Sequence, residues 1–155
     1  MCGIAGYYLT EHNHNYTNTD TFSSLLNAAK KSLSHRGPDD SGLFFSSGNI
    51  LGLAHTRLSI QDLSSAGHQP MSSNDGSVRI IFNGEIYNFC ELKSEIISKE
   101  NYSWKGNSDT EVILQLYLHT KSSGKSFKSF LKRLNGIFAL AIWDENSNEL
   151  FLARD

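Results

Sequence analysis

The sequence has no long hydrophobic run and no excess of either charge. Its apolar runs are no longer than a strand, which excludes a membrane-spanning helix. The 14 Lys and Arg residues oppose 16 Asp and Glu residues without forming a basic stripe, so nucleic acid is excluded as a partner. The N-terminus lacks the basic region of a signal peptide. These absences predict a cytoplasmic protein.

Cysteine is also scarce, with only Cys2 and Cys90 in 155 residues. The two thiols suffice for one disulfide, but a cytosolic setting argues against it. Cys90 is predicted to be a packed thiol on a helix. His12 and His14 stand in an Asn- and Thr-rich stretch without nearby cysteines or a carboxylate cluster, so we expect solvated side chains and no metal site. No internal repeat, low-complexity segment or phosphate loop of the G-x-x-x-x-G-K-[ST] type is present.

The pattern of apolar residues predicts strands and helices in separate groups. Strands are expected at 3–9, 42–46, 50–55, 78–82, 137–143 and 150–153, and helices at 21–33, 89–97, 109–119 and 127–134. Asn88 is the expected cap of the second helix, with Glu91 completing a capping box. Residues 10–20 and 64–75 are expected to be loops. This order, mostly without βαβ alternation, predicts one α+β domain with layered sheets.

Cys2 is the first candidate for chemistry. Removal of Met1 would leave a residue that carries both a thiol and a free α-amino group. The thiolate is the reactive form of cysteine, and an α-amino group titrates close to neutral pH. One residue therefore supplies both nucleophile and base, as N-terminal threonine nucleophiles do. The apolar strand expected from Gly3 onward would fix this terminus inside the fold.

Hydrolysis of an amide also needs hydrogen-bond donors for the oxygen of the tetrahedral intermediate. Asn83 and Gly84 offer a side-chain amide and a backbone N–H where a strand is expected to end. The alternative is a plain Asn-Gly hairpin turn. Against the hairpin, the residues that follow lead into a helix and not into a returning strand.

An amino-acid substrate would need an arginine for its carboxylate and an acid for its ammonium group. Arg57, after a strand, and Asp109, at the start of a helix, are candidates. Arg57 could equally be a surface ion-pair partner, and Asp109 could equally be only the N-cap of its helix. Composition and spacing leave both alternatives open.

Seven motifs in order resemble the class II glutamine amidotransferases, especially the glutaminase domain of asparagine synthetases. They are Met-Cys-Gly-Ile-Ala-Gly (1–6), His-Arg-Gly-Pro-Asp-Asp-Ser-Gly (35–42), His-Thr-Arg-Leu-Ser-Ile (55–60), Gly-His-Gln-Pro-Met (67–71), Phe-Asn-Gly-Glu-Ile-Tyr-Asn (82–88), Ser-Asp-Thr-Glu-Val (108–112) and Asn-Gly-Ile-Phe-Ala (135–139). The resemblance covers residues 1–155. It implies an N-terminal-nucleophile hydrolase fold, a four-layer α/β/β/α sandwich.

The resemblance also implies a role for each matching position. Cys2 is the nucleophile with its own amine as base, and Asn83 and Gly84 form the oxyanion hole. The glutamine-binding residues are Arg57 for the α-carboxylate, with Leu58 and Ile60 nearby, and Glu85 and Asp109 for the α-ammonium group. The polar side chains of the His-Arg-Gly-Pro-Asp motif and two further histidines are expected to be structural: His35, Arg36, Asp39, His55 and His68.

The implied reaction converts L-glutamine to glutamate and ammonia through a thioester, without a metal or cofactor. In the family, a second domain uses ATP and Mg²⁺ and consumes the ammonia; in asparagine synthetases it amidates aspartate. The chain ends directly after an expected strand, which predicts a truncated domain followed by a synthetase domain in the same polypeptide, as a possible homodimer. Two alternatives stay open: the same glutaminase serving an amino-sugar, phosphoribosyl or surface-polysaccharide acceptor, and a catalytically silent glutamine-binding module.

Overall fold

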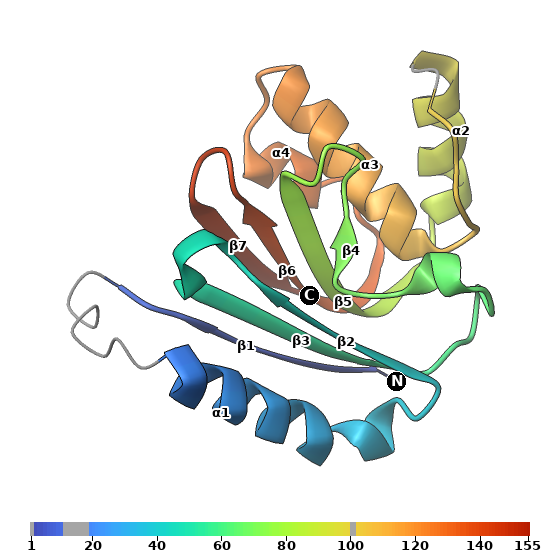
Figure 1. Cartoon of the computed structure of the whole chain (residues 1–155). Helices are drawn as coiled ribbons and strands as arrows, with labels where there is room; N and C mark the ends of the chain where they lie inside the picture. Colours follow the sequence, from blue (N-terminus) through green and yellow to red (C-terminus); the bar gives the residue numbers. More distant parts are fainter. Residues whose placement is uncertain (1, 11–18, 100–101) are drawn as a thin grey trace.

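The chain folds into four layers, two antiparallel sheets stacked between helices (Figure 1). The computed structural model describes residues 2–10, 19–99 and 102–155. Helix α1 (Thr19–Ser32) covers the outer face of the first sheet. The helices α2 (Phe89–Lys99), α3 (Asp109–Ser122) and α4 (Phe127–Leu131) lie on the side of the second sheet. The predicted α/β/β/α sandwich is confirmed.

The first sheet places the N-terminal segment beside the end of a buried strand. Its strand order is β1 (Gly3–Tyr8), β3 (Leu51–Arg57) and β2 (Asp40–Phe45). Every residue of β3 is buried, because α1 packs on one face and the second sheet on the other. Gly3 pairs with Thr56, so Cys2 lies next to the last residues of β3.

The second sheet is ordered β4 (Met71–Ser72), β5 (Val78–Ile86), β6 (Gly136–Asp144) and β7 (Glu149–Arg154). Five buried side chains fill the space between the two sheets: Leu51, Leu53, Ile81, Ala141 and Trp143. A larger cluster joins the outer face of the second sheet to the helices. Ten of the residues of α3 are buried, including polar ones, as expected for a helix enclosed by its neighbours.

Several local predictions are wrong at their boundaries. The strand predicted to stop at residue 82 continues through Asn83 and Gly84 to Ile86, because all nine residues of β5 pair with β6. The Asn-Gly hairpin is therefore excluded. The short strand β4 lies inside the predicted 64–75 loop. Three one-turn 3₁₀ helices lie in the connections between the described elements, at Ser34–Arg36, Ser47–Asn49 and Ser65–Gly67.

Two predictions on the second helix also fail. The side chain of Asn88 does not cap α2; its amide oxygen accepts a hydrogen bond from the backbone N–H of Asn135 at 3.1 Å, and its amide nitrogen donates to the carbonyl oxygen of Arg133 at 2.9 Å. These contacts tie the start of α2 to the segment before β6. Cys90 is exposed on α2 and not packed, and both cysteines are free thiols.

Candidate active site

One pocket of about 570 Å³ collects all eight residues predicted for the site. It lies where the start of β1, the end of β3, the end of β5 and the start of β6 meet, since antiparallel pairing brings these ends together. The predicted residues that line it are Cys2, Arg57, Leu58, Ile60, Asn83, Gly84, Glu85 and Asp109. These eight residues come from four separate segments of the chain and line one half-enclosed space.

Cys2 is held through its backbone carbonyl and through its sulfur. Its carbonyl oxygen accepts a hydrogen bond from Arg36 Nε at 2.9 Å. The backbone N–H of Leu58 donates to the Cys2 sulfur at 3.4 Å. The Cys2 thiol also lies 3.8 Å from the carbonyl oxygen of Leu58, to which it can donate. Cys2 is therefore fixed beside the pocket, and the contact of Arg36 with it fits the predicted structural role.

The edge of β5 explains why a backbone donor is available. Strand β4 pairs only with Arg79 and Ile80, so the later residues of β5 have no strand on that side. The N–H of Phe82 donates to Gln69 Oε1 at 2.7 Å, and the N–H of Ile86 donates to Asp109 Oδ2 at 3.2 Å. Because alternate residues of a strand point their N–H groups to the same edge, the N–H of Gly84 faces that edge too, at the pocket.

Glycine is the only residue that fits at position 84. A Cβ there would lie 2.3 Å from the carbonyl oxygen of Ile137 and 2.6 Å from the Cα of Phe138 on β6. The neighbouring Asn83 has a buried side-chain oxygen with no hydrogen-bond partner among the described residues. Unsatisfied buried polar atoms are rare in folded proteins and often mark functional sites. Asn83 and Gly84 thus offer polar groups to a ligand at one position.

Arg57 is a pocket residue and not a surface ion-pair partner. It is only 7% exposed, and its guanidinium donates to the carbonyl oxygens of Ser64, at 2.9 Å, and Asp62. Gly67 packs directly against it, since a Cβ at this position would lie 2.0 Å from Arg57 Nη2. These contacts fix the guanidinium at the wall of the pocket as a permanent positive charge.

Asp109 supplies the opposite charge. Ser108 is the N-cap of α3, so the alternative of Asp109 as a mere cap is wrong. Asp109 is buried, and this burial raises the pKa of its carboxyl group to about 6; the charge of Glu85 acts in the same direction, and the hydrogen bond from Ile86 opposes it. Among the described residues no Lys, Arg or His forms an ion pair with Asp109, and a buried carboxylate in this situation gains from a bound ammonium group.

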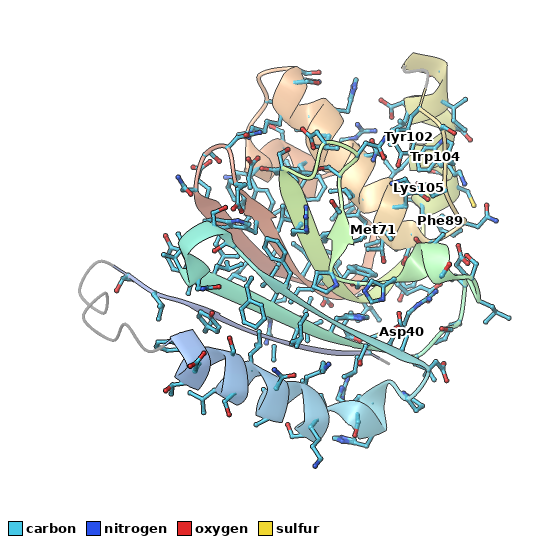
Figure 2. The ribbon with its side chains drawn as sticks, viewed as in Figure 1. Asp40, Met71, Phe89, Tyr102, Trp104 and Lys105 are labelled. Carbon is cyan, nitrogen blue, oxygen red and sulfur yellow. The ribbon has the colours of Figure 1, made fainter. Side chains whose placement is uncertain are left out.

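Two acidic residues to which the sequence analysis gave no role form hydrogen bonds to segments next to the pocket. Asp62 accepts hydrogen bonds from the Ser64 hydroxyl at 2.6 Å and the Asn107 N–H at 2.7 Å, and these bonds lower its pKa. Glu111 on α3 binds the segment before Ser108 through three donors at 2.9–3.0 Å, namely Tyr102 Oη and the backbone N–H groups of Lys105 and Gly106. Figure 2 shows Tyr102, Trp104 and Lys105 together beside α2. No local sequence pattern predicted these contacts.

The histidines and Asp39 make contacts that fit a structural role. His55 is buried between the sheets, where Nε2 lies 3.1 Å from the carbonyl oxygen of Phe82, and burial lowers its pKa to about 4. His68 Nδ1 pairs with Asp40 Oδ2 at 2.7 Å, and His35 Nδ1 lies 2.9 Å from the carbonyl oxygen of Ser32. The carboxylate of Asp39 accepts from the N–H of Ser59 at 2.8 Å.

The described residues contain neither a cluster of metal ligands nor a membrane-spanning helix. Within them, no three His, Cys, Asp or Glu side chains converge as metal ligands. His12 and His14 lie outside the described residues. None of the described helices combines the length and apolarity needed to cross a bilayer.

The layered fold is similar to that of a solved amidotransferase structure. The chain superposes over its full length on 37% of the glutamine phosphoribosylpyrophosphate amidotransferase of Bacillus subtilis, with a TM-score of 0.67 and 21% identity. This likeness shows the fold. The family model described as a glutamine amidotransferase domain matches residues 1–155. The chain belongs to this family.

Curated relatives match the whole chain. It is 39% identical over 155 residues to asparagine synthetase [glutamine-hydrolyzing] 1 of Bacillus subtilis and 36% identical over 160 residues to amidase chry2 of Gibberella zeae. All of this chain is covered in both comparisons, but only 22% of each relative. The chain thus spans about a fifth of the length of these proteins.

Proposed function

We propose that this chain is the glutaminase part of a glutamine-hydrolysing asparagine synthetase. The observation that supports it most is the pocket itself, in which the Cys2 thiol, the polar groups of Asn83 and Gly84, the cation of Arg57 and the buried acid Asp109 surround one cavity. A free amino acid with a side-chain amide complements this set. Its carboxylate would pair with Arg57, its ammonium group with Asp109 and Glu85, and its amide carbonyl would meet the oxyanion donors.

The reaction then proceeds in two steps. The Cys2 thiol gives its proton to the α-amino group, and its sulfur attacks the amide carbon of glutamine. The negative oxygen of the tetrahedral intermediate accepts hydrogen bonds from Asn83 Nδ2 and the Gly84 N–H, and the intermediate collapses to a thioester as the nitrogen takes up the proton and leaves as ammonia. Water attacks the thioester, releasing glutamate and restoring the thiol. Leu58 and Ile60 line the same pocket, and Leu58 contacts the Cys2 sulfur.

The ammonia would be consumed by a synthetase domain in the same polypeptide, which would use ATP and Mg²⁺ to amidate aspartate. The similarity to asparagine synthetase 1 of Bacillus subtilis and the much greater length of that protein support this arrangement. Nothing in the glutaminase step itself requires a metal or cofactor. We place the enzyme in the cytoplasm and propose a homodimer for the whole protein.

The amidase relative supports a second candidate, in which the same glutaminase serves a different acceptor. Both candidates share the chemistry of residues 1–155 and differ only in the domain that receives the ammonia. A silent glutamine-binding module is the third, and it predicts binding without glutamate release. The identity of the acceptor follows from assaying the full-length protein with aspartate and ATP.

The test is a mass measurement on the purified chain, with and without a diazo-ketone analogue of glutamine. We expect a mass that lacks Met1 and a single adduct on Cys2, because the thiolate displaces nitrogen from the diazo-ketone. Excess glutamine should suppress the adduct, and glutamate should appear when glutamine alone is added. Cys90→Ser is the matched control and should label as before. Retained Met1, or labelling that depends on Cys90, would contradict the proposal.

A further inference from the structure

Gln69 joins the two halves of the pocket through one side chain. It lies between the 3₁₀ turn Ser65–Gly67 and strand β4, is 5% exposed, and lines the pocket. Its Oε1 accepts from the backbone N–H of Phe82 at 2.7 Å, and its Nε2 donates to Thr110 Oγ1 at 3.2 Å. A single buried amide therefore connects β5 to the first turn of α3.

Each end of this connection is one residue away from a group that would bind substrate. Phe82 precedes Asn83, and the Gln69 bond is made on the edge of β5 where no strand supports the backbone. Thr110 follows Asp109, and its hydroxyl lies 3.5 Å from Asp109 Oδ1. The two hydrogen bonds of Gln69 therefore hold the strand that carries the oxyanion donors against the helix that carries the ammonium-binding acid.

In the proposed pose, the distance between those two positions has to match the length of the substrate side chain. The oxyanion donors hold the amide carbonyl, and Asp109 holds the ammonium group at the other end of the same molecule. We propose that Gln69 is a positioning residue that sets this spacing and so selects glutamine over shorter and longer amides. The inference rests on the proposed function, because it takes the glutamine pose from it.

A general structural role would have a different consequence. If Gln69 only stabilised the fold, its loss would lower activity toward every amide by the same factor. If it sets the spacing, its loss lowers activity toward glutamine more than toward asparagine, which lacks one methylene, or homoglutamine, which has one more. Enzymes typically discriminate ~10–200-fold between substrates that differ by one methylene, so a reduced preference for glutamine is measurable.

Gln69→Met keeps the length of the side chain and removes both hydrogen bonds. Thr110→Val keeps Gln69 but removes its hydrogen-bond partner on α3, together with the 3.5 Å contact to Asp109, and Thr110→Ser restores the hydroxyl. Gln115→Met is the matched control, because Gln115 is 4% exposed on α3 and does not line the pocket. For each variant, kcat and KM are measured for glutamine, asparagine and homoglutamine, together with the melting temperature.

We expect the ratio of kcat/KM for glutamine to that for asparagine to fall about tenfold in Gln69→Met and Thr110→Val. It should stay within about twofold of the parent in Thr110→Ser and Gln115→Met. Equal losses for all three amides, or an unchanged ratio, would overturn the inference; if Gln69→Met does not fold, the Thr110 pair decides. A parent chain that hydrolyses no glutamine would instead refute the proposed function, and the inference with it.

Discussion

The backbone N–H of Leu58 points at the sulfur of Cys2, 3.4 Å away. Leu58 directly follows Arg57, the last residue of β3, so the same strand end positions the nucleophile and the arginine. The pairing of Gly3 with Thr56 produces this arrangement, because it aligns the start of β1 with the end of β3. Fifty-six residues of chain separate the two groups that this sheet brings together.

Replacement of Cys2 by alanine should abolish glutamine hydrolysis and leave the fold intact. The side chain is half-buried at the start of a strand, and removal of its sulfur leaves the Arg36 bond to the Cys2 carbonyl in place. The melting temperature should change by less than about 3 °C. Glutamate release and thermal unfolding measure the two effects. Activity equal to that of the parent chain would contradict the catalytic role of Cys2.

Gly67→Ala should raise the KM for glutamine about tenfold with little change in kcat. Its new Cβ would collide with Arg57 Nη2, so the guanidinium must move from the wall of the pocket. Arg57→Ala should raise KM further, since it removes the cation that pairs with the substrate carboxylate. Ser65→Ala, on the same 3₁₀ turn but exposed, is the control. A KM unchanged in Arg57→Ala would exclude this residue from substrate binding.

Asp109→Asn should make the chain more stable at pH 7.5 but weaken glutamine binding. The pKa of Asp109 is raised from 3.8 to about 6, chiefly by burial, so its carboxyl group is charged in the folded chain only above pH 6. In the unfolded chain the same carboxyl group ionises near pH 4. Between pH 4 and 6 the folded chain therefore binds the proton more tightly, and the free energy of unfolding falls as the pH rises through this range.

The substitution should stabilise the chain by up to about 3 kcal/mol above pH 6, and the gain should shrink as the pH falls towards 4. Asparagine can still accept the hydrogen bond from the Ile86 N–H, so the substitution changes the charge without removing this bond. Urea unfolding at pH 7.5 and 4.5 measures the difference. Lower stability than the parent chain at pH 7.5 would show that the charge of Asp109 is already compensated in the folded state.

Asn83→Ala should reduce kcat for glutamine about 100–1000-fold, with a smaller effect on KM. The loss is the size expected when one oxyanion donor is removed, because the donor acts mainly on charge that develops in the transition state. Asn27→Ala, on the exposed face of α1, should leave the kinetics unchanged. If KM rose while kcat stayed constant, Asn83 would bind the ground state of the substrate instead.

Most helices and strands were predictable, because their apolar periodicity depends on neighbouring residues. The end of β5 was not, since Asn83 and Gly84 resemble a turn locally and pairing with β6 keeps them extended. Five of the eight pocket residues were candidates from their chemistry, and the family resemblance added Leu58, Ile60 and Glu85. The supporting contacts had no such signal: Asp62 binds Asn107 across 45 residues, and Gln69 binds Thr110 across 41. Contacts of this range depend on how the layers pack.

The amino-acid sequence by itself determined which reactive groups are present, because a thiol and an α-amine on one residue, an Asn-Gly pair and the charges of Arg57 and Asp109 are properties of covalent structure. Only the tertiary structure decided their spacing and their electrostatics. Burial beside the edge of β5 raises the pKa of Asp109 to about 6, and the same edge, where no strand pairs, exposes the Gly84 N–H to the pocket. Both effects arise because desolvation and hydrogen-bond pairing depend on segments remote in the chain.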